Sequence, residues 1–355
     1  MRIALLSYST RPRGGVVHTL ALAEALAAQG QDVTVWTLGR GGDEGFFRPV
    51  DPAVKVRIVP FPDVPGEDVG PRILRSIALL RRAFTPGDYD IVHAQDCISA
   101  NAVDRCLRTI HHLDRFTTPE LAACHEKAIV RPYAHICVSA AVAAEVRAGW
   151  GRTPAVIPNG VEAARFAAAV PDSRPGPYLL AVGGIEPRKG SVELLDAYAK
   201  VRAEIPHLDL VIAGGETLFD YRSYRASWEA RARELGVTPH VLGPVPHDEL
   251  PGLVAGAAVF AFPSVKEGFG MAAMEALAAG TPVVVSDLPV FREVFGDTVL
   301  YGRGVDGLAA ALREALHRPS ADRTARGRER AAAHTWSAAA GRHLEFYRSV
   351  LTRVE

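Results

Sequence analysis

Short apolar runs alternate with longer amphipathic segments along the whole chain. In the first half, apolar runs at residues 2–7 and 32–38 flank the segment 18–30, whose apolar residues recur with the helical period and which ends at Gly30. The alternation continues with strands expected at residues 54–61, 90–96 and 135–140 and a helix expected at 141–150. Strands that alternate with helices in this way predict βαβ units and a parallel sheet covered by helices on both faces.

The alternation breaks in a proline-rich segment, residues 156–177, and then starts again. We expect strands at residues 178–183, 208–215, 240–245, 257–264 and 281–288 and helices at 191–205, 228–237 and 269–280. The chain is therefore predicted to be an α/β protein with two Rossmann-like parallel-sheet domains, residues 1–160 and 178–335, joined by a linker at 161–177. A final amphipathic helix at 336–355 is expected to pack back towards the N-terminal domain.

This architecture predicts where a ligand would bind. In an open parallel sheet, ligands bind outside the carboxyl ends of the strands, at the point where the strand order reverses. Two such domains that face each other would form a central cleft. Side chains that come just after a strand are therefore the candidates for a binding site.

The composition narrows the classes of function. The chain has 355 residues, of which 48% are hydrophobic and 23% are charged, which is enough apolar material for two cores. Lys plus Arg and Asp plus Glu both number 40, so the charge balance gives no basis for nucleic-acid binding. No apolar run approaches about 18 residues, so no transmembrane helix is expected. The N-terminal run lacks a cleavage pattern and is interpreted as a strand, which favours a cytoplasmic protein.

The cysteines are spaced irregularly and include no Cys-x-x-Cys pair. They are Cys97, Cys106, Cys124 and Cys137. A zinc site could use the histidines that lie nearby in the sequence, which are His111, His112 and His125. Buried free thiols are favoured over zinc and over a disulfide framework, because the spacing matches neither.

Two glycines follow the first expected strand. Gly14 and Gly15 precede a helix, so free backbone amides and the positive end of the helix dipole would suit an anion. A plain turn explains a glycine pair equally well, and both interpretations stay open.

Two cations follow the first expected strand of the second domain. Arg188 and Lys189 stand just before the helix expected from Ser191, where the helix dipole favours negative charge. Cations are unfavourable at this position unless an anion shares the site. The pair therefore favours an anionic ligand over a solvated turn.

The segment 265–280 places two glutamates eight positions apart around the start of a helix. Glu267 precedes the helix, Glu275 lies about a turn and a half into it, and the apolar residues form the face that packs on the sheet. The amides at the helix start lack partners inside the helix. They belong to Phe269, Gly270 and Met271. A ligand with both hydroxyl and phosphate groups would satisfy the carboxylates and the amides together.

Two further patterns are interpreted as structural. Asp88 and Asp90 form an Asp-x-Asp pattern of the kind that can bind a metal, but here it leads directly into a strand. The amphipathic segment 71–84 carries several arginines and could rest on an anionic membrane surface. An ordinary surface helix is favoured for this segment.

The segment "EGFGMAAMEALAAGTPVVVSD" resembles the Glu-x7-Glu motif of the retaining glycosyltransferases of family 4, also called glycosyl transferases group 1, which have the two-domain GT-B fold. Other family segments have counterparts in the same order and at similar spacing: "GGVVHTLALAEALAAQGQDVTV", "YDIVHAQD", "VIPNGVEAARF", "VGGIEPRKG" and "VLGPV". The resemblance covers nearly the whole chain.

The resemblance implies a nucleotide-diphosphate sugar as donor, bound mainly by the C-terminal domain, with no metal and no cofactor. Glu275 would hold the ribose hydroxyls, and Glu267 would hold the hydroxyls of the transferred sugar. Arg188 and Lys189 would neutralise the diphosphate. The amides of residues 269–271 would contact the sugar and the phosphate.

The resemblance also implies roles for the N-terminal, acceptor-binding domain. Gly14 or Gly15 would let its backbone approach the diphosphate. Relatives often carry a histidine near the reacting carbon of the sugar, and here it would be His111, with His112 as the alternative.

The nucleotide base would lie against a strand of the C-terminal domain, at Val241, Leu242 and Gly243. The acceptor would be a small molecule, a glycan or a lipid-linked compound, and the oligomeric state stays open.

One position departs from the family pattern. Many relatives carry an arginine directly after the glycine that ends the strand, whereas this chain has Gly184 after Gly183. The diphosphate would then be held with fewer contacts, by Arg188 and Lys189.

The expected activity is metal-independent transfer of a sugar with retention, through same-face attack assisted by the leaving diphosphate. A UDP-sugar is favoured over a GDP-sugar. The alternatives are a sugar-nucleotide epimerase or hydrolase on the same scaffold, and a non-catalytic sugar-nucleotide-binding protein. A dinucleotide-dependent oxidoreductase is disfavoured because no Gly-x-Gly-x-x-Gly follows the first strand.

Overall fold

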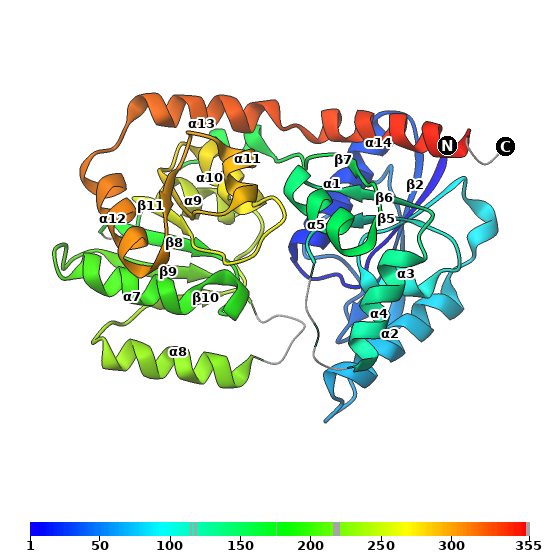
Figure 1. The fold of residues 1–355 in the computed structure, drawn as a ribbon, viewed down its shortest axis with the longest axis horizontal. Helices are drawn as coiled ribbons and strands as arrows, with labels where there is room; N and C mark the ends of the chain where they lie inside the picture. Colours follow the sequence, from blue (N-terminus) through cyan, green and yellow to red (C-terminus); the bar gives the residue numbers. More distant parts are fainter. Residues whose placement is uncertain (114–115, 117–118, 175, 216–220, 353–355) are drawn as a thin grey trace. The chain divides into compact units, whose positions relative to one another are not determined.

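Each half of the chain builds one parallel β-sheet, so the predicted fold class of two Rossmann-like α/β domains is confirmed (Figure 1). The computed structural model describes residues 1–113, 116, 119–174, 176–215 and 221–352. The chain divides into two compact units, which we call unit 1 and unit 2. Unit 1 consists of Met1–Gly160 and Trp336–Glu355, and unit 2 consists of Val161–Thr335.

The sheet of unit 1 has seven parallel strands in the order β3-β2-β1-β4-β5-β6-β7. The strands are β1 (Arg2–Leu6), β2 (Asp32–Arg40), β3 (Lys55–Phe61), β4 (Ile91–Ala94), β5 (Leu107–Ile110), β6 (Ala134–Cys137) and β7 (Ala155–Val156). In β1, every residue after Arg2 is fully buried. A continuous apolar run is what a strand covered on both faces requires.

The helices of unit 1 include the last helix of the chain. They are α1 (Gly14–Ala28), α2 (Val69–Ala83), α3 (Cys97–Ala102), α4 (Pro119–Val130), α5 (Ala140–Trp150) and α14 (Trp336–Leu351), with the 3-10 turn η1 (Pro86–Asp88). Leu344 and Tyr347 of α14 share a hydrophobic cluster with Ile3 and Leu5 of β1. The end of the chain therefore completes the core of unit 1; residues 353–355 lie outside the described residues.

The sheet of unit 2 has six parallel strands in the order β10-β9-β8-β11-β12-β13. They are β8 (Tyr178–Val182), β9 (Asp209–Ala213), β10 (His240–Gly243), β11 (Val259–Phe262), β12 (Val283–Ser286) and β13 (Leu300–Gly302). The helices are α6 (Ala163–Ala167), α7 (Ser191–Arg202), α8 (Arg222–Glu234), α9 (Leu250–Ala255), α10 (Met271–Ala279), α11 (Pro289–Phe295), α12 (Gly304–His317) and α13 (Ala321–Ala333), with the 3-10 turn η2 (Pro187–Lys189).

The strand order reverses once in each sheet, between β1 and β4 in unit 1 and between β8 and β11 in unit 2. This is the doubly wound order, in which ligands bind at the carboxyl ends of the strands beside the reversal. The loops that follow these four strands are therefore the positions where binding residues are expected.

The segment 161–177, predicted to be a linker, belongs to unit 2 and contains the helix α6. Its Phe166 is 1% exposed, and α6 packs against α10. The prolines that suggested a linker lie on either side of α6. Burial of one aromatic side chain thus outweighs the local proline content.

The sequence pattern did not predict three of the strands, β5, β7 and β13, which have four, two and three residues. Runs this short hold too few positions to reveal a period of two. The Asp-x-Asp pattern serves the sheet, because Asp90 accepts hydrogen bonds from the backbone and the side chain of Arg2 at 2.8 and 2.9 Å.

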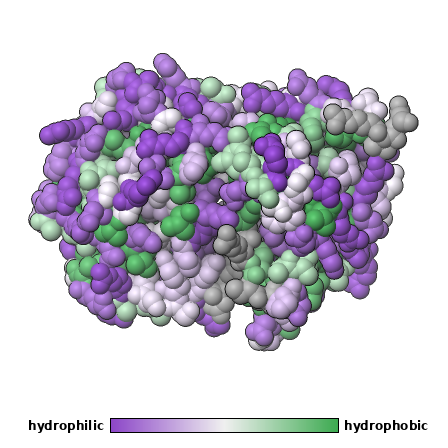
Figure 2. All heavy atoms as spheres, viewed as in Figure 1, coloured by the Kyte–Doolittle hydropathy of each residue, from purple (hydrophilic) through white to green (hydrophobic). Residues whose placement is uncertain are grey.

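The surface is mostly polar on the face shown in Figure 2, where apolar residues form only separate patches. On α2, Arg75 is paired with Glu67 at 2.6 Å and Arg81 donates to the carbonyl oxygen of Asn101 at 2.5 Å. Two of the arginines that suggested a membrane-facing helix are therefore engaged by the protein itself. Within the part of the chain that the structure describes, no helix has both the length and the apolar character to cross a membrane.

Candidate functional site

Charged side chains converge at the reversal of strand order in unit 2. The loop after β8 contributes Arg188 and Lys189, which lie in η2. The loop after β11 contributes Glu267. These residues meet because the carboxyl ends of neighbouring parallel strands lie at the same edge of a sheet.

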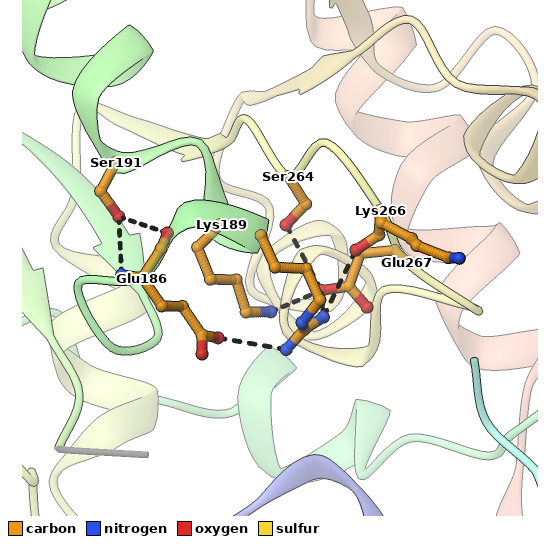
Figure 3. Close-up of polar contacts among 7 residues, drawn as sticks. Glu186, Lys189, Ser191, Ser264, Lys266 and Glu267 are labelled. Carbon is orange, nitrogen blue, oxygen red and sulfur yellow. Dashed lines mark hydrogen bonds and ion pairs between the residues drawn. The ribbon is translucent and has the colours of Figure 1, made fainter. Parts of the chain in front are cut away.

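Glu267 is the centre of this cluster. Its Oε1 accepts hydrogen bonds from Arg188 Nη1 at 2.9 Å and from Lys189 Nζ at 2.5 Å (Figure 3). Ser264 Oγ donates to the same oxygen at 3.3 Å. The Glu267 side chain is 11% exposed, so these charge-assisted bonds are only partly screened by water.

A second carboxylate balances the cations. Glu186 Oε1 lies 3.2 Å from Arg188 Nη2, and the Glu186 side chain is 8% exposed (Figure 3). Two carboxylates and two cations leave this group with no net charge. The interpretation that Arg188 and Lys189 require an external anion is therefore incomplete, because Glu186 and Glu267 already pair with them. We call Glu186, Arg188, Lys189 and Glu267 the charge cluster.

Two glycines with positive φ bring the loops of this site together. Gly190 (φ 64°) precedes α7, and a Cβ there would lie 2.1 Å from the carbonyl oxygen of Pro263. Gly270 (φ 94°) precedes α10, and its Cβ would lie 3.0 Å from the ring of Phe295. Any larger residue would therefore push η2 away from the loop after β11, or misplace the start of α10.

The start of α10 presents backbone donors. Within the described residues, the amides of Phe269, Gly270 and Met271 donate no hydrogen bond. Phe269 itself is 3% exposed, with its ring 5.7 Å from that of His334. A buried ring at this position fixes the direction of the amides, which suit an anion or a polar ligand.

Glu275 lies in the second turn of α10 and is half-buried. Burial raises the pKa of its carboxyl to about 8, and the nearby carboxylate of Glu162 adds to the rise while Arg165 opposes it. Arg165 forms its own ion pair with Glu162 at 2.7 Å. Among the described residues no hydrogen bond reaches the Glu275 carboxyl. A carboxyl placed in this way is suited to a ligand hydroxyl.

The predicted base-binding residues form the edge strand β10, which contains Val241, Leu242 and Gly243. The ends of three strands are joined by backbone hydrogen bonds, from Gly183 to Ala213 and from Gly214 to Gly243, each of 2.8 Å. The position after Gly183 is Gly184, so the family's arginine has no counterpart here. The charge cluster supplies the cations at this edge of the sheet.

In unit 1, Gly14 and Gly15 are the first residues of α1, and His111 follows β5. A Cβ on Gly15 would lie 3.7 Å from the ring of His111, and no atom of His112 lies within 4 Å of that point. The structure thus places His111 beside the glycine turn, although the two are distant in sequence.

His111 is held as a neutral ring. Its pKa is lowered to about 3, mainly by burial and in addition by the nearby His112, Arg108 and His343. Its Nε2 has no hydrogen-bond partner among the described residues. A neutral imidazole of this kind can donate to or accept from a ligand hydroxyl.

Sequence reasoning missed the ring that packs on His111. The His18 and His111 centroids are 4.7 Å apart in an edge-to-face arrangement, and His18 Nδ1 lies 3.0 Å from Asn159 Oδ1. His18 and Asn159 stand in two of the segments quoted for the resemblance, but nothing in the pattern of either segment indicates that His18 meets Asn159 or His111. Among the described residues, no group of three or more His, Cys, Asp or Glu side chains is arranged to hold a metal ion.

Two doubly wound sheets in one chain, with a charge cluster at the reversal of the second, agree with the GT-B architecture of glycosyltransferases. Family models match both halves: residues 165–333 match "Glycosyl transferases group 1" and residues 12–165 match "Glycosyltransferase Family 4". The chain belongs to this glycosyltransferase family.

Known proteins agree with this assignment. The chain is 30% identical to a phosphatidyl-myo-inositol mannosyltransferase of Mycolicibacterium smegmatis, over 99% of this chain and 94% of the relative. It shares its fold with sucrose-phosphate synthase from Thermosynechococcus elongatus (TM-score 0.80, 22% identity, 99% of each chain). It also shares its fold with Anabaena HepE in complex with UDP-glucose (TM-score 0.75, 17% identity, 98% of this chain and 100% of that one).

Proposed function

We propose that this protein is a retaining glycosyltransferase that takes a sugar from a nucleotide-diphosphate donor without a metal ion. The observation that carries the proposal is the charge cluster at the reversal of strand order in unit 2, beside the half-buried Glu275 and the amides at the start of α10, which donate to no described residue. Together they offer cations and amides for phosphates, and carboxyl groups for hydroxyls. A nucleotide-diphosphate sugar carries both kinds of group.

Each group of unit 2 has a role in this proposal. The cations Arg188 and Lys189 neutralise the charge that develops on the departing diphosphate. Glu267, which holds both cations in place, binds the hydroxyls of the transferred sugar. Glu275 binds the ribose hydroxyls, and β10 contacts the base through its backbone.

The reaction breaks the bond between the anomeric carbon and the diphosphate oxygen, and the diphosphate leaves with the electron pair. The acceptor oxygen forms its bond to the same face of that carbon, and its proton passes to the diphosphate. Retention follows from attack on the same face. In unit 1, the neutral His111 is proposed to bind a hydroxyl of a reacting sugar beside Gly15.

The donor is proposed to be a UDP-sugar, a choice supported by the fold shared with HepE in complex with UDP-glucose. We place the acceptor in unit 1 as part of this proposal. The mannosyltransferase relative is named for a phosphatidylinositol, and the structural neighbour is named for a sugar phosphate. A small molecule, a glycan and a lipid-linked compound are therefore the acceptor classes to test.

Thermal unfolding with UDP, GDP, ADP and dTDP, each added separately, tests the donor. A ligand at 100 times its dissociation constant stabilises the protein by about 2.7 kcal/mol, which raises the melting temperature by several degrees. UDP is expected to give the largest rise. A rise with GDP alone would replace the UDP assignment, and no rise with any nucleotide would contradict the donor site.

Replacing Lys189 with alanine is expected to weaken binding of the donor nucleotide about tenfold or more, because a charge-assisted hydrogen bond contributes roughly 1.5–3 kcal/mol. Titration calorimetry with the nucleotide that binds the wild type measures the change. Lys200→Ala is the matched control, since Lys200 forms an exposed ion pair with Asp306 at 2.6 Å on the same unit. Equal affinity in Lys189→Ala and Lys200→Ala would overturn the role of the charge cluster.

A further inference from the structure

A cysteine, a histidine and an arginine meet in unit 1, in a group that has no part in the proposed reaction. Cys97 is the first residue of α3, Arg108 lies on β5 and His125 lies on α4. Arg108 Nη2 donates to Cys97 Sγ at 3.2 Å, and His125 Nδ1 lies 3.3 Å from the same sulfur. We call these three residues the Cys97 cluster.

The guanidinium of Arg108 is buried and forms no close ion pair with a carboxylate among the described residues. Arg108 is 3% exposed, and its Nη1 donates to the carbonyl oxygen of Ala128 at 2.7 Å. Among the described residues, no Asp or Glu oxygen lies within 4.0 Å of it, and its Nε makes no hydrogen bond. Asp96 interacts with Arg108 through its charge but makes no hydrogen bond to it among the described residues. The ionisable group that Arg108 contacts directly is the sulfur of Cys97.

The neighbouring carboxyl of Asp96 acts on Arg108 through its charge, while its hydrogen bonds go elsewhere. Asp96 caps α3 and accepts from the Ser99 amide at 2.8 Å. Burial raises the pKa of Asp96 to about 6, and Ser99 and the charge of Arg108 only partly offset the rise. The hydrogen bonds of the Asp96 carboxyl are therefore made with the start of α3, whereas Arg108 donates to the sulfur of Cys97.

The other cysteines provide a contrast within the same chain. Burial raises the pKa of Cys106 and of Cys137 to about 12, and both are buried. Cys124 is half-buried like Cys97, and burial raises its pKa too. Within the described parts of the chain, no cation donates a hydrogen bond to the sulfur of Cys106, Cys124 or Cys137.

We propose that Cys97 is the reactive thiol of this chain, held as a thiolate by Arg108 and His125, and that it is a site of covalent modification by peroxides. A thiolate beside a cation and a histidine is the arrangement that makes cysteine nucleophilic. The sulfur attacks one oxygen of hydrogen peroxide, so that an S–O bond forms and the O–O bond breaks. Sulfur loses two electrons and becomes a sulfenic acid, and the departing hydroxide takes up a proton to become water.

Iodoacetamide labelling of the folded protein, followed by peptide mass spectrometry, measures the rate at each cysteine separately. At pH 7, Cys97 is expected to react at least about tenfold faster than Cys124, because an ordinary thiol is only a few per cent ionised at that pH. Cys106 and Cys137 are expected to stay unlabelled until the protein unfolds. With hydrogen peroxide and dimedone, the sulfenic acid adduct is expected at Cys97 alone.

The pH profile of labelling in the wild type is the second measurement, and it needs no variant. The rate at Cys97 is expected to stay high down to about pH 6, whereas the rate at Cys124 falls steadily below pH 8. Arg108→Gln is expected to lower the rate at Cys97 at least about fivefold at pH 7, and Arg108→Lys to retain most of it. Equal rates at Cys97 and Cys124, or parallel pH profiles, would overturn the proposal even if the Arg108 variants fail to fold.

Discussion

Replacing Glu275 with glutamine is expected to stabilise the ligand-free protein by about 2 kcal/mol at pH 7 and at the same time to weaken donor binding about tenfold. Glutamine has the same shape but carries no proton equilibrium. It also lacks the second carboxylate oxygen that would hold a pair of ribose hydroxyls. One substitution would therefore raise the stability of the ligand-free protein and lower its affinity for the donor.

The sign of the stability change follows from the raised pKa of Glu275. Its folded pKa is about 8 because of burial and Glu162, against 4.5 for the ordinary carboxyl. Below pH 4.5 the carboxyl is protonated in both states and costs nothing. Between pH 4.5 and 8 only the unfolded state ionises, so stability falls as pH rises, by up to about 1.4 kcal/mol per pH unit. The stabilisation of about 2 kcal/mol expected at pH 7 is smaller than this slope gives, because the Glu275 side chain keeps part of its contact with water.

Urea unfolding of Glu275→Gln and the wild type at pH 5 and pH 7 measures this effect. The gap between the two proteins is expected to be wide at pH 7 and small at pH 5. Glu314→Gln serves as the control, since Glu314 is exposed and paired with Arg323 on the same unit. A variant that is less stable than the wild type at both pH values would show that the Glu275 carboxylate is satisfied in the free protein.

The arrangement of the charged loops could be predicted from the sequence, because it depends on topology. Alternating strands and helices dictate a parallel sheet, and residues that follow neighbouring strands must meet at one edge. Arg188 and Glu267 are therefore expected near each other before any side chain is placed. The pairing of both cations with Glu267 was not predictable, because it depends on η2 and on the close approach at Gly190.

Other contacts have no signal in a single sequence. His18 meets His111, and Cys97 meets Arg108, across distances in the chain that only the three-dimensional fold closes. Each of these residues has ordinary neighbours in its own segment. The helix α6 was hidden for a different reason, since prolines surround it and its stability comes from burying Phe166.

Unit 1 is expected to unfold between about pH 6 and pH 4.5 at 25 °C, well above the range of ordinary acid unfolding. Buried histidines with lowered pKa values gather in this unit: His18, His93, His111, His135 and His343. Burial is the main cause in each, and no carboxylate contributes to any of the five. Hydrogen bonds raise the pKa values of His18, His135 and His343, but burial outweighs them.

The pH window follows from the direction of these shifts. Above pH 6.5 the rings are neutral in both states and do not affect stability. Below pH 6.5, the histidines bind protons in the unfolded chain but not in the folded unit. Each histidine then lowers the free energy of unfolding by about 1.4 kcal/mol per pH unit. At pH 5 the five together cost roughly 10 kcal/mol, comparable with the whole stability of a domain. Asp96 opposes the loss, because its pKa is raised to about 6, but one group recovers only about 3 kcal/mol.

Tryptophan fluorescence measures this transition in unit 1 once Trp228, the tryptophan of unit 2, is replaced by phenylalanine. The remaining tryptophans all belong to unit 1, and Trp336 lies 5.3 Å from the His18 ring. In this background, His343→Gln removes one titrating ring, so the midpoint is expected to move to lower pH. The exposed His207→Gln should leave it unchanged. Fluorescence that stays native down to pH 4 would contradict this prediction, since the burial of His18, His93 and His343 would then cost much less stability than expected.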